Sequence, residues 1–127
     1  MSLYVFPPEA QPSVAVRGSE ARYAVSRIFC VGRNYAAHAR EMGSDPDREP
    51  PFFFSKPANA LVASGSTVPY PPGTKNYHYE MELVVAIGAP MFRVTPEVAQ
   101  AGIWAFAAGL DMTRRDLQAD AKANGRP

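Results

Sequence analysis

Residues 76–88 read NYHYEMELVVAIG, and this segment has the alternating pattern of a β-strand. In a strand, every second side chain points to the same face. The odd-numbered positions from 77 to 87 are all apolar or aromatic. The even-numbered positions carry a histidine and two glutamates, followed by apolar residues: His78, Glu80, Glu82, Val84 and Ala86. Two like charges therefore stand next to each other on one face, where something must offset their repulsion.

Glu80 and Glu82 allow two interpretations. Same-face positions on a strand lie roughly 7 Å apart, so both carboxylates could bind one divalent cation, which would remove their repulsion. All-oxygen ligands favour Mg²⁺ or Mn²⁺ over Zn²⁺. The alternative is a solvated strand face, which is the more common setting for a Glu-x-Glu pair on an antiparallel sheet. Val84 and Ala86 weaken this alternative because they make the same face dry, and His78 is better explained by packing than by ligation.

The composition is that of a globular protein without a strong net charge. The chain has 127 residues, enough for one domain with a modest core, and 13 basic against 12 acidic side chains give a net charge of +1. This balance argues against a nucleic-acid-binding surface and against attraction to an anionic membrane. The single cysteine, Cys30, excludes an internal disulfide and fits a reducing compartment. With neither a signal peptide nor an apolar segment of membrane length, the sequence predicts a cytoplasmic protein.

Three further segments have the composition of short strands. They are RIFCV at 27–31, the three phenylalanines within PFFFSKP at 51–57, and the apolar run IWAFAAGL at 103–110, which we expect to be buried. Helix signals mark three other segments, each of which begins with a capping residue and ends with glycine: 34–43, 95–102 and 113–125. In the last of these, Thr113 and Asp116 have the spacing of a capping box. The pattern predicts an α+β fold dominated by short strands.

Three more acidic or titratable positions could carry chemistry. Asp111 follows the apolar run. If Thr113 caps the next helix, Asp111 has no evident structural role of its own, although a role in a turn is an equally good interpretation. His38 and Glu41 are three residues apart on a predicted helix and can touch. A histidine oriented by a carboxylate could act as a general base, whereas an exposed surface pair is the more common arrangement.

Two basic residues and the cysteine are less informative. Lys56 and Arg115 could hold an anionic substrate, but single basic side chains are usually only solvated. Cys30 has no basic neighbour in the sequence, so we interpret it as a core residue rather than a nucleophile.

Four motifs occur in an order that resembles one enzyme family. They are GRNYAAHAREMG at 32–43, PFFFSKP at 51–57, YHYEMELVVAIG at 77–88 and GLDMTRRDLQ at 109–118. Together they resemble the fumarylacetoacetate hydrolase family over about residues 27–127, and most closely its acylpyruvate hydrolase (fumarylpyruvate hydrolase) branch. Four motifs in the same order are far more specific than any one of them alone.

The resemblance implies a fold, a metal and partners. The family fold is a mixed β-rich roll that usually forms a homodimer, so the expected class is α+β. The resemblance also implies Mg²⁺, with Mn²⁺ as the other candidate, bound by the three matching carboxylates of Glu80, Glu82 and Asp111. The expected ligand is a small-molecule 2-oxo acid, with no nucleic-acid or membrane partner.

The resemblance further implies hydrolysis of a C–C bond in an acylpyruvate, which gives pyruvate and a carboxylic acid. His38 and Glu41 would lie on a lid-like helix and activate the attacking water, while the charged groups of the substrate would contact Lys56, Arg115 and Arg33. The same scaffold could instead decarboxylate an oxaloacetate-type 2-oxo acid or isomerise a hydroxymuconate-type diacid.

Two segments are expected: an extended, proline-rich segment over 1–26 and the N-terminal portion of the catalytic domain over 27–127. Members of the family continue past the segment that matches GRP at 125–127, through a further active-site lysine and more strands. We therefore expect the β-rich roll to be incomplete here. A non-catalytic binding or assembly fragment is the alternative from a different functional class.

Overall fold

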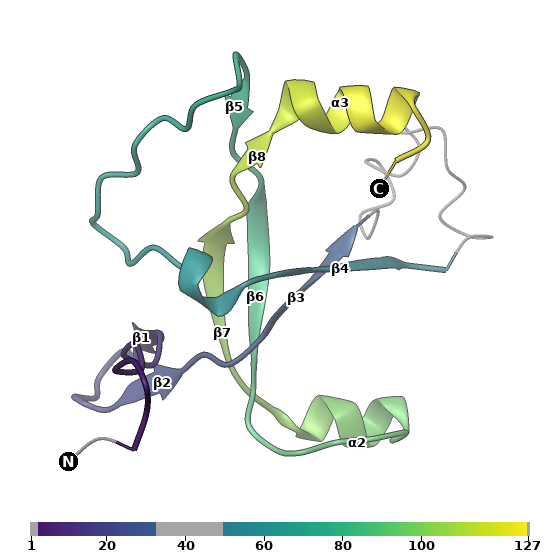
Figure 1. The fold of residues 1–127 in the computed structure, drawn as a ribbon. Coiled ribbons are helices and arrows are strands. Elements are labelled where there is room, and N and C mark those ends of the chain that lie inside the picture. The colour runs from purple at the N-terminus through teal and green to yellow at the C-terminus, as the bar shows by residue number, and fades with distance from the viewer. Residues whose placement is uncertain (1–2, 33–49, 127) are drawn as a thin grey trace. The chain divides into compact units, whose positions relative to one another are not determined.

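The structure is a computed structural model, and it describes residues 3–32 and 50–126. These ranges contain eight short strands, two α-helices and one 3-10 helix (Figure 1). By its internal contacts the chain divides into two compact units, Met1–Val68 and Pro69–Pro127, and each is described here by itself. The mixture of short strands and few helices confirms the predicted α+β class, whereas the boundary expected at residue 27 stays a prediction.

The first unit consists of two antiparallel hairpin-like pairs. β1 (Ser13–Ala15) pairs with β2 (Arg22–Ala24). β3 (Ile28–Gly32) pairs with β4 (Phe52–Lys56), and the 3-10 helix η1 (Ala58–Ala60) follows Pro57. The predicted strands at 27–31 and in PFFFSKP are therefore confirmed, and their β-branched and aromatic side chains account for the local preference.

The second unit is built on one interrupted antiparallel ribbon. β6 (Met81–Ile87) pairs with β7 (Ile103–Leu110), and β5 (Tyr77–His78) pairs with β8 (Thr113–Arg114). Both pairs share one register, and between them the backbone amide of Asp111 donates to the carbonyl of Glu80 at 2.8 Å. The strand predicted over 76–88 is thus confirmed at Tyr77–His78 and Met81–Ile87, with an interruption at Tyr79 and Glu80.

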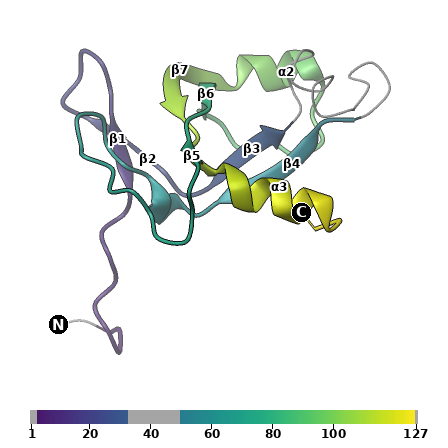
Figure 2. The same cartoon turned by 90° about the horizontal axis from the view of Figure 1, so that it is seen from above.

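Two helices lie at opposite ends of this ribbon (Figures 1 and 2). α2 (Pro96–Ala101) begins after Thr95, whose hydroxyl accepts from the amide of Val98 at 3.3 Å, and Gly102 ends it, as predicted. α3 spans Arg115–Ala123. The helix predicted over 34–43 lies outside the described residues. No helix within 3–32 or 50–126 is long and apolar enough to span a membrane.

The predicted capping box of α3 is wrong. The N-cap residue is Arg114, and no side-chain hydrogen bond caps the N-terminus of this helix. The ladder with β5 holds Thr113 opposite His78, and the Thr113 hydroxyl instead donates to the carbonyl of Asp111 at 3.1 Å. The carboxylate of Asp116 accepts from the amide of Lys75 at 2.8 Å. Strand pairing therefore prevailed over the local capping pattern.

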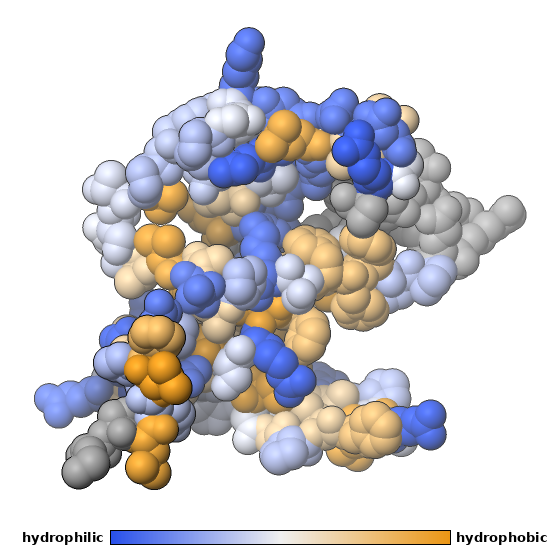
Figure 3. All heavy atoms as spheres, viewed as in Figure 1, coloured by the Kyte–Doolittle hydropathy of each residue, from blue (hydrophilic) through white to orange (hydrophobic). Residues whose placement is uncertain are grey.

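Apolar side chains of the ribbon reach the surface. No residue in the described ranges is fully buried, and large hydrophobic side chains of β6 and β7 are more than half exposed: Met81, Leu83, Trp104, Phe106 and Leu110. Hydrophobic atoms are visible at several places in Figure 3. The expectation that the strand over 103–110 is buried is therefore wrong, because a two-stranded ribbon leaves both faces accessible unless another layer covers them.

Candidate functional site

The interruption of the ribbon brings the three predicted carboxylate residues to one face. Glu80 and Asp111 stand opposite each other there, and Glu82 follows two residues along, opposite Gly109. Residues directly opposite in an antiparallel pair have Cβ atoms about 5 Å apart on the same face, and successive same-face residues lie roughly 7 Å apart. The backbone register thus places Glu80, Glu82 and Asp111 along a short stretch of the same face of the ribbon.

Gly109 lies beside this acidic stretch, where it stands opposite Glu82. A Cβ atom added to Gly109 would lie 2.7 Å from Cγ2 of Val84, closer than van der Waals contact allows. The glycine therefore permits the close packing of the Val84 side chain over the ribbon at this position.

Arg115 lies at the edge of the same stretch. Its Nη2 atom is 2.8 Å from Oε1 of Glu80, and its Nη1 atom donates to Oε1 of Gln118 at 2.8 Å. Its backbone amide donates to the carbonyl of Asn76 at 2.8 Å, which extends the ribbon register by one more pair. The structure therefore brings Arg115, a predicted substrate residue, into direct contact with one predicted metal ligand. Gln118 was not predicted from the sequence as a site residue. It lies three residues after Arg115 on α3, a spacing at which helical side chains can touch.

The carboxylates are not gathered into a finished metal site. Within residues 3–32 and 50–126, no three His, Cys, Asp or Glu side chains are arranged to hold a metal ion. The side chain of Glu80 turns to Arg115 instead, while Oδ1 of Asp111 has less than 1 Å² of accessible surface. The donor set is all oxygen, which a hard divalent cation prefers, and Glu80 contacts Arg115 through Oε1 alone among the interactions described.

Asp116 fixes the loop that leads into β5. Its carboxylate accepts from the amide of Lys75, the hydroxyl of Thr74 and the amide of Leu117. These hydrogen bonds, chiefly that from Lys75, lower the pKa of the Asp116 carboxyl below its ordinary value of 3.8. The first turn of α3 is thereby tied to residues 74–76, so Arg115 is held at a defined position beside the ribbon.

The structure describes some of the other predicted site residues but not all of them. His38, Glu41 and Arg33 lie outside the described residues. Lys56 is the last residue of β4, opposite Ile28 in the first unit, and is partly exposed. His78, which shares the face of the glutamates, is exposed and stacks on Tyr79 with ring centroids 5.0 Å apart.

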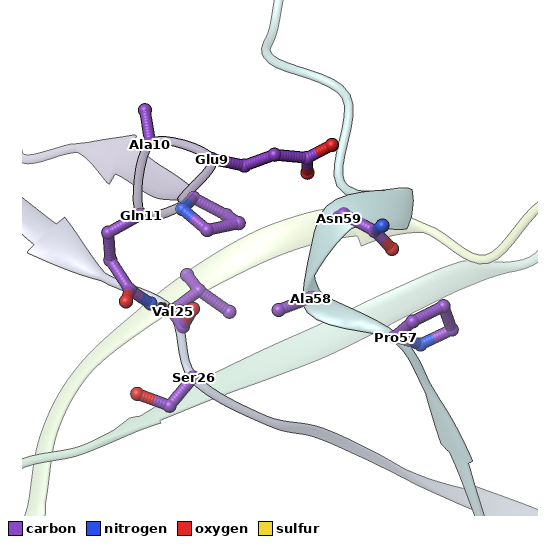
Figure 4. A pocket seen from close by; sticks show the side chains of 9 residues that line it. Glu9, Ala10, Gln11, Val25, Ser26, Pro57, Ala58 and Asn59 are labelled. Carbon is purple, nitrogen blue, oxygen red and sulfur yellow. Dashed lines mark hydrogen bonds between the residues drawn. The ribbon is translucent and has the colours of Figure 1, made fainter. Parts of the chain in front are cut away.

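The first unit contains a hollow of about 480 Å³ that none of the predicted site residues lines (Figure 4). It lies between residues 9–12, the segment Val25–Ser26 and residues 57–59. Its lining includes one carboxylate, that of Glu9, and no cationic side chain. Such a lining is unsuited to an anionic ligand, so the acidic stretch with Arg115 is the better candidate site among the described residues.

Comparison with known proteins points in one direction. Residues 27–126 match the family model described as fumarylacetoacetate (FAA) hydrolase C-terminal. A fumarylpyruvate hydrolase of a Ralstonia species is 58% identical over 88 residues, which cover 68% of this chain and 46% of that protein. A mitochondrial oxaloacetate tautomerase of Arabidopsis thaliana is 43% identical over 102 residues, or 80% of this chain and 45% of that protein.

A solved structure is similar over nearly all of the chain. The crystal structure of fumarylpyruvate hydrolase from Pseudomonas aeruginosa, in complex with Mn²⁺ and pyruvate, has a TM-score of 0.89 and 56% identity. It is matched over 98% of this chain but only 55% of its own length. The present chain thus spans about half the length of the relatives that it matches.

Proposed function

The chain belongs to the fumarylacetoacetate hydrolase family, and on this basis we propose that it serves in the metal-dependent hydrolysis of acylpyruvates such as fumarylpyruvate. The reaction would give pyruvate and a carboxylic acid. The observation that carries the proposal is the shared ribbon register, which puts Glu80, Glu82 and Asp111 on one face beside Arg115. The similarity to fumarylpyruvate hydrolases at 56–58% identity supports the same substrate class.

Glu80, Glu82 and Asp111 would hold Mg²⁺ or Mn²⁺ through their carboxylate oxygens. Support comes from the donor set and from the Pseudomonas relative, whose structure contains Mn²⁺ and pyruvate. When bound, a divalent cation supplies Lewis-acid stabilisation of negative charge on a 2-oxo acid. The small number of protein ligands leaves positions for water or substrate, as is usual for Mg²⁺ in catalytic sites.

The chain's own residues would then bind the substrate and transfer protons. Arg115 would hold the carboxylate of the 2-oxo acid end, because a guanidinium matches a carboxylate with two parallel hydrogen bonds. Lys56 and Arg33 would contact the remaining charged groups. His38, oriented by Glu41, would take a proton from water, which adds to the distal carbonyl carbon. The C–C bond then breaks, and pyruvate leaves as an enolate that takes up a proton.

The wider architecture of the protein is part of the proposal. We place the ribbon in a mixed β-rich roll in which further strands cover the exposed apolar side chains of β6 and β7. We also propose that the functional protein is a homodimer in the cytoplasm. A non-catalytic binding or assembly role for the present chain is the alternative.

Oxaloacetate tautomerisation is a second candidate function. It is supported by the Arabidopsis relative, which is an oxaloacetate tautomerase 43% identical to this chain. Interconversion of keto and enol forms needs proton transfer at the carbon beside the 2-oxo group but no attacking water. The same carboxylates and Arg115 would serve both reactions, so the arrangement of the ribbon does not separate them.

Product analysis separates these functions. The chain is incubated with fumarylpyruvate or oxaloacetate, with Mn²⁺ or with a chelator, and the products are followed by NMR. Pyruvate and fumarate formed only with Mn²⁺ would support hydrolysis. Accelerated keto–enol exchange of oxaloacetate without cleavage would support tautomerisation, and release of CO₂ would indicate decarboxylation. Absence of all three with metal present would contradict an enzymatic role for this chain.

A further inference from the structure

We propose that Asp116 is a positioning residue of the candidate site, because its carboxylate ties the start of α3 to residues 74–76 and thereby sets the place of the Arg115 guanidinium. The inference rests on the proposed function, in which Arg115 holds the carboxylate of a 2-oxo acid. It adds a residue that acts only through Arg115. Loss of the Asp116 carboxylate would weaken binding of the 2-oxo acid without removing any group that contacts it.

A set of hydrogen bonds, called the latch below, joins the segment before β5 to the first turn of α3. The carboxylate of Asp116 accepts from the amide of Lys75 at 2.8 Å and from the hydroxyl of Thr74. The Thr74 oxygen in turn accepts from the amide of Asn76 at 3.1 Å. The carbonyl of Asn76 accepts from the amide of Arg115 at 2.8 Å. These bonds form a closed ring, which begins and ends at neighbouring residues of α3.

The latch is the main restraint on the start of α3. Within the described part of the chain, α3 buries no side chain, and no side-chain hydrogen bond caps its N-terminus. Its packing against other elements there is chiefly with β5 and β8. These two strands pair over only two residues each, and an isolated short strand pair is marginally stable. Without the latch, the helix would therefore be held by a weak strand pair alone.

The two segments that the latch joins carry the two partners of the ion pair. Residues 74–80 lead through β5 to Glu80, and residues 113–118 carry Arg115 and Gln118. Nη2 of Arg115 lies 2.8 Å from Oε1 of Glu80, and Nη1 donates to Oε1 of Gln118 at 2.8 Å. A guanidinium has five N–H donors, so these contacts leave others for a carboxylate. Binding by two parallel hydrogen bonds requires a fixed guanidinium plane, which a loosened helix would not provide.

The first test is the NMR spectrum of the Arg115 guanidinium in the full chain, assigned with Arg115→Lys. Nη1 and Nη2 should give separate signals in the unaltered chain, because they have different partners and rotation of the group is slowed. Asp116→Ala should merge them into one averaged signal. The matched control is Asp120→Ala, which removes a carboxylate one turn further along α3, where its partner is Asn124. This control should keep the two signals apart.

The second test is the dissociation constant for pyruvate, measured by calorimetry in a buffer that contains Mg²⁺. Asp116→Ala should raise this constant by about fivefold or more, because the displaced guanidinium loses hydrogen bonds to the carboxylate. Asp120→Ala should change it by less than about twofold. Asp116→Asn keeps an oxygen that can accept from the amide of Lys75, so it should restore part of the affinity and part of the separation between the Nη signals.

The outcomes separate this inference from the proposed function. Separate Nη signals and an unchanged dissociation constant in Asp116→Ala would overturn the inference. If circular dichroism shows that this variant is unfolded, Thr74→Val decides instead, because it removes part of the latch and keeps the bond from Lys75. It should bring the Nη signals closer together, and unchanged signals would count against the inference. If the unaltered chain binds no pyruvate, the proposed function fails, while the Nη signals still decide whether Asp116 positions Arg115.

Discussion

Replacement of Gly109 by alanine tests the packing beside the candidate site. The added Cβ would lie 2.7 Å from Cγ2 of Val84, whereas carbon atoms prefer separations of about 3.5–4.0 Å. The overlap is close to 1 Å by these values, and the ladder with Glu82 restrains the backbone at this position. Overpacking of this kind typically costs 1–3 kcal/mol. Because Val84 is 43% exposed and has room to shift, we expect a loss near the lower limit, about 1 kcal/mol.

A double-mutant cycle isolates the contact. Urea unfolding is measured for the unaltered chain, Gly109→Ala, Val84→Ala and the double variant, in which no Cγ2 atom remains to collide with the new methyl group. Gly109→Ala should destabilise the chain in the Val84 background and cost about 0.5 kcal/mol or less when residue 84 is alanine. If Gly109→Ala lowers the free energy of unfolding equally in both backgrounds, the reasoning is refuted. The backbone conformation, rather than contact with Val84, would then explain why glycine is needed.

Three other perturbations address the site and its support. Glu82→Gln should weaken Mn²⁺ binding by about tenfold or more, whereas Glu97→Gln on α2 should leave it unchanged in the same titration; equal effects would remove Glu82 from the ligand set. Asp116 has a lowered pKa in the folded state, so its stabilising contribution is present above pH 3.8 and is lost as the pH falls through the folded-state pKa. Asp116→Asn should therefore flatten the acid limb of stability measured by circular dichroism, and an unchanged limb would contradict the hydrogen bonds assigned to this carboxylate. His38→Ala should lower fumarylpyruvate hydrolysis by at least about a hundredfold while Mn²⁺ affinity is kept; full activity in a coupled pyruvate assay would exclude His38 as the base.

Several helices and strands were predicted correctly, because the residues that start and end them interact only with their neighbours in the sequence. The start of α2 follows from Thr95 and Pro96, and β7 coincides with its apolar run. The start of α3 was misjudged because Thr113 is held by strand pairing with His78, which the residues around Thr113 do not reveal. Asp116 likewise accepts a hydrogen bond from the amide of Lys75, which lies 41 residues away.

The contacts within the candidate site could not be predicted from the sequence. The alternation around Glu80 and Glu82 indicated a shared face, and Asp111 and Arg115 were candidates from their places in the sequence, to which the family resemblance gave roles. The pairing of Glu80 with Arg115 depends on the register between two distant segments and on the position of α3. Neither follows from spacing along the chain, so the ion pair between Glu80 and Arg115 became visible only in the structure.

The most direct test of this account is a crystal structure of the chain with Mn²⁺, in which anomalous scattering locates the ion. The account predicts one ion bound by carboxylate oxygens of Glu80, Glu82 and Asp111. An ion bound elsewhere, or no ion at all, would contradict it.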